Sequence, residues 1–472
     1  MATPTAPSPL VEDPSENSLS IVWRLAWPAV ALNSLQTLNA LLDSSFVGSL
    51  EPAALTALGA ATPFIFLLVS LSFALGTAAT ALVARAYGAG EREQFVQSNQ
   101  QCISLSLVGG FLLALAAIPL GHFAAQAMLP AEATRAAALM MQFMAIFAFS
   151  LPAIFIMQTL AGSLRGIGDT KSPMYISGLQ ILIHIVLNFL LIFPTREWNG
   201  ITIPGANLGI QGAALGLTLS AWIAAAIYLG WSVRTPLGNV WRLGLPNLKW
   251  AKRILNVAVP AAMMSIVRVT SLMGFTYVLS HVPHGENAIA AMRVGFSIEA
   301  FAFMPAFGLA IAASALVGQS LGMQRPDRAE RLAWTSAHQA AIVSFVISVG
   351  LFVFALPIAT LILPTKPAIA EIASHYVLYI AATEVLFAYG MVMVGGLQGA
   401  GDTVRPLWLT IFSMWLIRVP LAAFLALPSI GPIRGLNMGS DGCWLAMSIT
   451  QVIQGIMAMV VFKQGKWKLK VV

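Results

Sequence analysis

Residues 21–50 read IVWRLAWPAVALNSLQTLNALLDSSFVGSL, an apolar run with one acidic residue, Asp43, near its end. A carboxylate inside a membrane-spanning helix is costly unless it has a partner, a proton or a water-filled cavity. Helical steps of three and four residues give Asp43 a polar stripe on its own face, made of Asn33, Gln36 and Asn39. We therefore expect a long helix whose polar stripe is shielded from lipid by the rest of the protein.

The composition is that of a multi-span membrane protein. Of the 472 residues, 58% are hydrophobic and 9% are charged, whereas soluble domains contain about 25% charged residues. The alternating ten-residue segments of a transmembrane β-barrel are absent from the sequence. About twelve stretches reach the roughly 20 apolar residues of a spanning helix. The predicted spans of this all-α membrane protein are 22–48, 54–84, 97–126, 134–162, 173–194, 207–233, 254–282, 288–318, 331–362, 368–396, 407–428 and 441–462.

The net charge of +7 is distributed unevenly over the breaks between these spans. Breaks after the even-numbered spans hold most of the Lys and Arg, and the other breaks hold only Arg135, Arg196, Lys366 and Arg434. The positive-inside rule places the first set in the cytoplasm. Because the number of spans is even, both termini are expected there too, in a multi-pass protein of the inner (plasma) membrane. This pattern does not favour nucleic acid as a partner.

Polar breaks suggest the domain organisation. Residues 1–18 are rich in Pro, Ser and acidic side chains and lack the features of a signal peptide, so we expect a disordered cytoplasmic tail. An N-terminal six-helix bundle (19–233), a cytoplasmic linker (234–253), a C-terminal six-helix bundle (254–463) and a basic tail (464–472) follow. Cys102 and Cys443 lie in apolar stretches and are expected to be buried thiols, without a disulfide or a metal site.

The two halves of the chain repeat each other. Ala81-Leu82-Val83 recurs as Ala315-Leu316-Val317, and Gly168-Asp169-Thr170 recurs at nearly the same offset as Gly401-Asp402-Thr403. Pro28 in the first span is matched by Pro260 in the seventh. Six spans per half give both halves the same orientation, so we expect a symmetry axis along the membrane normal and a cavity between the halves. Asp169 and Asp402 are interpreted as helix-end residues that orient their turns.

Repeated halves around a polar site are typical of secondary transporters. The sequence lacks a metal-ligand pair, a His-Glu-x-x-His motif, a nucleophile elbow and a phosphate loop. We therefore expect no enzyme, no cofactor and no direct use of ATP, which leaves an ion gradient as the energy source. An intramembrane enzyme or a receptor is the alternative from another class, and neither a catalytic motif nor a sizeable extramembrane domain supports it.

Several motifs together resemble the multidrug and toxic compound extrusion family of transporters. They are Asp43–Gly48, Ala84–Gly90, Leu164–Thr170, Phe303–Gly308, Leu316–Gly322 and Leu397–Thr403. The resemblance covers nearly the whole chain. It implies twelve transmembrane helices in two pseudo-symmetric six-helix bundles, with a V-shaped central cavity. It also implies exchange of a bulky, often cationic compound for H⁺ or Na⁺.

The resemblance implies a coupling site in the N-terminal half. Gln36 and Asp43 match the polar first-span positions of the family, and Pro28 matches the proline about which that helix bends. His184 and Asn188 stand where archaeal-type members carry Asn and Asp, and Thr218 fits the polar sixth-span position. The candidate coupling residues are Asp43, Gln36, Asn39, His184, Asn188 and Thr218. For each neutral member, helix–helix contact is the alternative to ion contact, and His184 is a proton relay, a counterion of Asp43 or a packed core residue.

The second half carries charges within or near its spans: Arg268, Arg293, Glu299, Glu384 and Arg418. One family subgroup has a Glu eight residues after the seventh-span proline, where this chain has Arg268. Unpaired charges inside a membrane are costly, so we expect pairs such as Arg268 with Glu299 or Glu384. The sequence leaves open whether such pairs are structural or contact the substrate.

The primary hypothesis is a monomeric antiporter that exports hydrophobic or cationic compounds in exchange for protons by alternating access. Na⁺ is the alternative coupling ion, less favoured because carboxylates are scarce. The alternative function on the same fold is a lipid-linked precursor flippase or an organic-anion exporter, which the intramembrane arginines favour. Expected partners are small-molecule substrates and membrane lipids.

Overall fold

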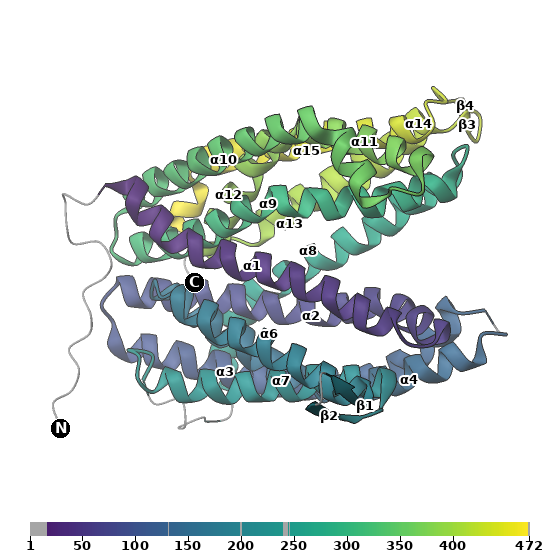
Figure 1. Ribbon diagram of the computed structural model, residues 1–472. Coiled ribbons are helices and arrows are strands. Elements are labelled where there is room, and N and C mark those ends of the chain that lie inside the picture. Colours follow the sequence, from purple (N-terminus) through teal and green to yellow (C-terminus); the bar gives the residue numbers. More distant parts are fainter. Residues whose placement is uncertain (1–16, 131, 199–200, 239–243, 245, 471–472) are drawn as a thin grey trace. The chain divides into compact units, whose positions relative to one another are not determined.

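The structure is a computed structural model that describes residues 17–130, 132–198, 201–238, 244 and 246–470. Almost all of it is helical (Figure 1). The first half contains α1 (Ser18–Gly48), α2 (Pro52–Gly88), α3 (Arg92–Met128), α4 (Thr134–Ala148), α5 (Leu151–Gly166), α6 (Lys171–Ile192), β1 (Pro194–Trp198), β2 (Ile201–Ala206) and α7 (Gly209–Ser232). The predicted tail at residues 1–18 lies almost wholly outside the described residues.

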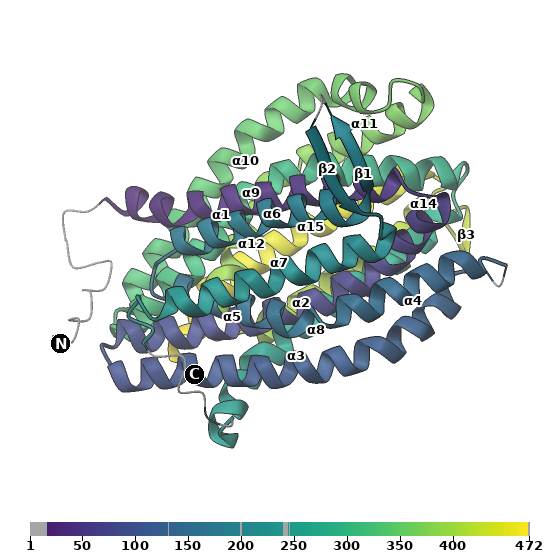
Figure 2. The same cartoon turned by 60° about the horizontal axis from the view of Figure 1, so that its bottom comes forward.

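The second half repeats this order. It contains α8 (Leu248–Ser280), α9 (Gly285–Gly322), α10 (Pro326–Ile362), α11 (Pro367–Ala381), α12 (Glu384–Gly399), α13 (Val404–Thr410), η1 (Ile411–Arg418), α14 (Val419–Ala426), β3 (Ser429–Ile430), β4 (Ile433–Arg434), α15 (Ser440–Lys463) and η2 (Lys466–Leu469). The short antiparallel hairpins β1–β2 and β3–β4 occupy matching places in the two halves. Figure 2 shows β1 and β2 at the ends of α6 and α7, which lie side by side. The sequence analysis did not predict these hairpins.

Each predicted span corresponds to one helix or one broken helix. Within the described residues, nine helices are long and apolar enough to cross a membrane, and two bent pairs bring the number to eleven. The bent pairs are α4–α5, with an angle of 49°, and α11–α12, with an angle of 58°. The remaining predicted span is α1, which is less apolar because of its polar stripe. The span prediction therefore missed the two bends and placed the other ends within a few residues.

The repeat is visible in the backbone as well as in the sequence. Gly168 and Gly401 have φ values of 84° and 81° at matching helix ends, where glycine adopts the left-handed conformation without strain. Asp169 accepts hydrogen bonds from the backbone nitrogen and hydroxyl of Ser172, and Asp402 pairs with Arg405. Both aspartates therefore fix their turns as expected.

Close helix contacts in the two halves also match. A Cβ on Gly162 of α5 would lie 2.2 Å from the carbonyl oxygen of Gly76 on α2. In the second half, a Cβ on Gly395 of α12 would lie 2.5 Å from the carbonyl oxygen of Ala310 on α9. Small residues let helix backbones approach each other in membranes, where dispersion replaces the hydrophobic effect as the force between helices. Each half therefore has a tightly packed central helix pair.

The chain forms two compact units whose boundaries fall inside two long helices. Ala31–Ala262 belong to one unit, and Met263 onward together with the described residues up to Val30 belong to the other. Both boundaries lie two residues after a proline inside a helix, Pro28 in α1 and Pro260 in α8. Proline removes a backbone hydrogen bond and weakens a helix at that point. The bundles predicted at 19–233 and 254–463, and the cavity between them, stay predictions.

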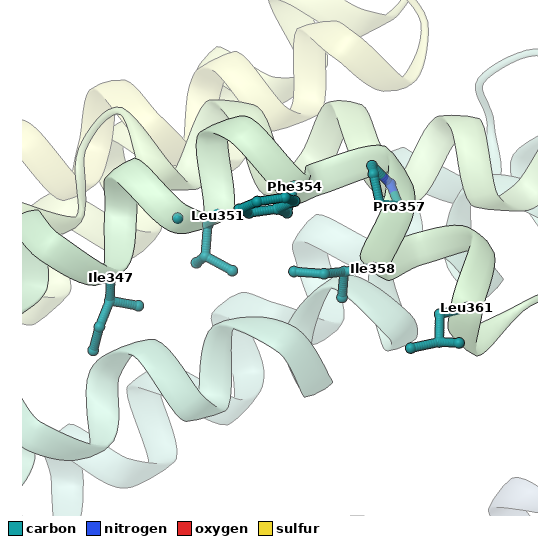
Figure 3. A pocket seen from close by; sticks show the side chains of 7 residues that line it. Ile347, Leu351, Phe354, Pro357, Ile358 and Leu361 are labelled. Atoms are coloured by element: carbon teal, nitrogen blue, oxygen red, sulfur yellow. The ribbon is translucent and has the colours of Figure 1, made fainter.

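One further helix is distorted near its end. α10 has a non-helical residue, Phe354, with φ of −108° and ψ of 15°, and Pro357 lies one turn later. An apolar hollow of about 470 Å³ lies along α10 on both sides of this kink (Figure 3). It is lined by Ile347, Gly350, Leu351, Phe354, Pro357, Ile358 and Leu361. Proline is a recognised cause of such kinks.

Candidate functional site

The first candidate site surrounds Asp43 in the unit formed by Ala31–Ala262. One carboxylate oxygen, Oδ1, accepts hydrogen bonds from His184 Nε2 at 2.9 Å and from Asn188 Nδ2 at 2.8 Å. The other oxygen, Oδ2, accepts a hydrogen bond from Asn39 Nδ2 at 3.2 Å. The side chain of Asp43 is 31% exposed, whereas His184 and Asn188 are almost fully buried. Three of the six predicted coupling residues therefore converge on Asp43.

Helix spacing explains how these residues meet. Asn39 lies one turn before Asp43 on α1, and His184 lies one turn before Asn188 on α6, so each pair shares a helix face. Gly216 of α7 leaves the room that Asn188 occupies, because a Cβ there would lie 2.4 Å from Asn188 Oδ1. The site is thus built by α1 and α6, with α7 closing it from behind.

Three atoms around the carboxylate have no hydrogen-bond partner within the described residues. They are Asn39 Oδ1, Asn188 Oδ1 and His184 Nδ1. Buried polar groups are almost always paired, and unpaired ones mark places where a proton, an ion or a water is expected. The carboxylate thus has hydrogen-bond donors on both oxygens, while acceptor atoms of Asn39 and Asn188 are left without a partner in the described structure.

Two predicted members of the coupling site lie outside this group. Gln36 shares the helix face of Asn39 and Asp43, but its side chain is exposed and does not join the hydrogen bonds to the carboxylate. The hydroxyl of Thr218 donates to backbone carbonyls instead, at 2.8 Å to Ala214 and 3.2 Å to Ile146. A buried threonine in an apolar helix satisfies its hydroxyl most easily with a carbonyl one turn earlier, which explains the difference. A group of three or more His, Cys, Asp or Glu that could hold a metal ion is not found in the part of the chain that the structure describes.

A second polar cluster lies inside the unit that contains Met263 and the residues after it. Glu299 of α9 accepts hydrogen bonds from the hydroxyl of Tyr376 on α11 and, at 3.2 Å, from Gln451 Nε2 on α15. Gln451 Oε1 in turn accepts from Thr383 Oγ1 at 2.8 Å. A Cβ on Gly295 would lie 2.2 Å from the Tyr376 ring, so this glycine leaves space for the tyrosine. Tyr376 and Gln451 therefore supply the hydrogen bonds of Glu299, and Arg418 interacts with it electrostatically.

The expected pairing of Arg268 with Glu299 or Glu384 is not found among the described residues, and this expectation is wrong. Arg268 is exposed, and Arg293 is exposed as well. Arg418 is buried and donates from Nε to Thr450 Oγ1 at 3.0 Å. Glu384 is fully buried, and both carboxyl oxygens have no hydrogen-bond partner in the described structure. The arginine that interacts electrostatically with Glu299 is Arg418, whereas the hydrogen bonds of Glu299 come from Tyr376 and Gln451.

The sequence analysis did not predict Tyr376 and Gln451 as members of this cluster. Tyr376 and Gln451 are polar residues inside apolar spans, and the reasoning applied to Asp43 could have found them. Arg418 ends η1, a π-helix of eight residues, and such segments are often found at functional sites. Ser271 donates to the carbonyl of Met414 in this segment at 2.9 Å. No sequence signal that we recognise marks the π-helix.

A family model described as MatE matches residues 28–190 and, a second time, residues 260–424. The chain belongs to the MatE family. The two matches begin at Pro28 and Pro260, so the same model fits each half and the internal repeat is confirmed. The family resemblance inferred from the motifs is confirmed as well.

Relatives of this MatE protein match over most of their length. A probable multidrug resistance protein NorM from Thermotoga maritima is 28% identical over 456 residues, which cover 95% of this chain and 93% of the relative. A FAD transporter from Shewanella oneidensis is 25% identical over 423 residues, which cover 88% of each protein. A crystal structure of MATE in complex with MaL6 has a TM-score of 0.86 at 22% identity and covers 95% of this chain and 96% of that chain.

These matches bear out the fold class: the MatE chain is an all-α, multi-pass membrane transporter. A transporter family is not an enzyme class. The role of Asp43 and its partners is not addressed by this likeness and rests on the geometry of the site.

Proposed function

We propose that this MatE transporter exports hydrophobic or cationic small molecules across the inner membrane in exchange for protons, with Asp43 as the proton-coupling residue. The observation that carries the proposal is the convergence of His184, Asn188 and Asn39 on one carboxylate inside an apolar helix bundle. Relatives named as multidrug resistance proteins support the substrate class. The distribution of Lys and Arg supports termini in the cytoplasm.

The chemistry of the site favours a proton over a sodium ion. The groups that contact Asp43 are two amide N–H donors and a histidine ring nitrogen, whereas Na⁺ is bound by several oxygen ligands. A proton needs only one base, which the carboxylate supplies. When Asp43 is protonated it becomes a donor, and Asn39 Oδ1, which lacks a partner, is one helical turn away and can accept after rotation of the amide.

The position of Pro28 supports coupling between this proton and a change of conformation. α1 carries Asp43 in one compact unit and begins in the other, with the division two residues after Pro28. A change in the hydrogen bonds of Asp43 would alter how the second part of α1 packs, and the weak point at the proline allows the first part to stay in place. A ligand and a proton that each favour one of two states are thereby coupled.

The test is drug–proton exchange in everted membrane vesicles that carry a proton gradient. Asp43→Asn keeps the size of the side chain and removes the exchangeable proton, so gradient-driven uptake of a fluorescent lipophilic cation into the everted vesicles should fall to the level of vesicles without the protein. Asp169→Asn, at a helix-end turn, is the matched control and should retain exchange. Undiminished exchange by Asp43→Asn would rule out this coupling role.

A second candidate function is export of organic anions on the same fold. Arg268 and Arg293 are exposed intramembrane cations, and one relative is named as a FAD transporter. Direct binding to the purified protein separates the two candidates. Tighter binding of tetraphenylphosphonium than of FAD supports the primary proposal, and the opposite order supports the second.

A further inference from the structure

An apolar groove of about 300 Å³ lies in the first unit where the beginning of α8 crosses α2 and α3. Ala74 of α2 and Ala258 and Ala262 of α8 form part of its wall, and every lining residue is apolar. Figure 2 shows α8 beside α2 and α3. Leu112 of α3 is 62% exposed and Val259 of α8 is 48% exposed, so the groove is open at its side.

At the corresponding place in the other half of the repeat, the helices are packed more closely than they are at this groove. Counted from the matching prolines Pro28 and Pro260, the residues of α1 that correspond to Ala258 and Ala262 are Ala26 and Val30. Ala74 of α2 corresponds to Gly308 of α9, at the offset that relates the Ala-Leu-Val motifs of the two halves. In the second unit those three residues are packed so closely that a Cβ on Gly308 would lie 2.4 Å from Val30 Cγ2 and 3.0 Å from Ala26 O.

The same segment of α8 departs from the repeat in charge. Lys249 and Lys252 are exposed, and neither side chain has an acidic partner among the described residues. The corresponding positions before Pro28 hold the uncharged residues Asn17 and Ser20. The first part of α8 therefore differs from the first part of α1 in two ways: it borders an open apolar groove, and it carries the exposed residues Lys249 and Lys252.

The geometry of α8 brings the two features to one place. Lys252 lies one helical turn before Leu255, which lines the groove, and on the same face of the helix. In the same first turns of α8, the guanidinium of Arg253 lies 4.5 Å from the ring centre of Trp250. Aromatic and basic residues are enriched at membrane–water interfaces. Val259 is seven residues beyond Lys252, roughly 10 Å deeper along the helix.

We propose that this groove binds one acyl chain of an anionic phospholipid, with Lys249 and Lys252 holding the phosphate. The acyl chain fills the space that Val30 fills in the repeat, and the headgroup charge pairs with the two lysines, for which the described part of the chain supplies no acidic partner. A lipophilic cation is disfavoured by the same lysines. The bound lipid fixes the part of α8 that precedes Pro260 to the first unit, next to the place where the two compact units divide.

Native mass spectrometry of the purified full chain tests the proposal with phosphatidylglycerol and phosphatidylcholine of identical acyl chains. The parent protein should bind phosphatidylglycerol preferentially. One basic residue near an anionic headgroup contributes about 1 kcal/mol, so Lys249→Gln and Lys252→Gln should each lower the preference about fivefold. Lys463→Gln/Lys466→Gln makes the same change in charge at exposed sites elsewhere and should keep the preference.

A second variant tests the groove itself. Ala262→Leu fills part of the groove and should reduce the bound number of both lipids at this site. Equal binding of the two lipids by the parent, or an unchanged preference in Lys249→Gln and Lys252→Gln, would overturn the proposal. So would unchanged lipid binding by Ala262→Leu, or displacement of the bound lipid by tetraphenylphosphonium, which would assign the groove to substrate.

Discussion

Replacing Gly216 by alanine is the sharpest test of the site around Asp43, because it acts on the network without removing any of its polar groups. The added Cβ would lie 2.4 Å from Asn188 Oδ1, a distance at which the asparagine side chain must move. Asn188 Nδ2 donates to Asp43 Oδ1 at 2.8 Å, and this bond would be lost or lengthened. We therefore expect Gly216→Ala to weaken both the folded state and transport.

The size of the effect follows from two opposing contributions. A hydrogen bond to a charged group contributes about 1.5–3 kcal/mol. Glycine in a helix interior is less favourable than alanine by about 0.5–1 kcal/mol, and the substitution regains this amount. The net loss of unfolding free energy should be about 1–2 kcal/mol. Gly230→Ala on the same helix is the matched control, since nothing lies within 4 Å of a Cβ there; it should be neutral or slightly stabilising.

The assay is unfolding of the purified protein in mixed micelles, together with drug–proton exchange in everted vesicles. A double-mutant cycle with Asn188→Ala separates the clash from other effects, because neighbouring residues that share a contact are not additive. Gly216→Ala/Asn188→Ala should be no less stable than Asn188→Ala alone. The reasoning is refuted if Gly216→Ala behaves like Gly230→Ala, or if the losses of the two single variants add.

Two further predictions concern the second half. Gly399→Ala would place a Cβ 2.0 Å from the backbone carbonyl oxygen of Ser314, so the protein should lose folded yield in detergent by size-exclusion chromatography, whereas Gly350→Ala, with nothing within 4 Å, should not. Trp467→Ala should lower the free energy of chemical unfolding by about 3–5 kcal/mol. The ring is fully buried, its centre lies 4.6 Å from that of Phe462, and its Nε1 donates to the Phe462 carbonyl. A loss below about 1 kcal/mol would contradict a packed role for Trp467.

The basic tail predicted at 464–472 illustrates a limit of composition. Its charges indicate a solvated segment, yet η2 places Trp467 in the core and Lys468 within 2.6 Å of Glu330 on α10. The hydrogen bond to Glu330 raises the pKa of Lys468 above its usual value. Trp467 and Lys468 thus both attach this segment to the rest of the unit, through contacts that composition does not indicate.

The sequence by itself determined the class of the protein. Long apolar runs require membrane helices, and motifs at nearly constant offsets establish the repeat. The sidedness that the uneven Lys and Arg indicate stays a prediction. It also identified Asp43 and Asn39, because polar residues in an apolar run are costly without a partner, and the family resemblance added His184 and Asn188.

Only the tertiary structure decided which predicted residues meet. Thr218 bonds to its own helix and to a neighbouring backbone, and Tyr376 rather than Arg268 donates to Glu299. The groove beside α8 is open, whereas Val30 of α1 packs against Gly308 at the corresponding place in the repeat. Helical periodicity fixes the face on which a side chain lies, whereas the partner opposite that face depends on packing between segments far apart in the chain. Such contacts depend on small differences in the distance between helices, which single glycines and alanines set. These distances cannot be read from one sequence.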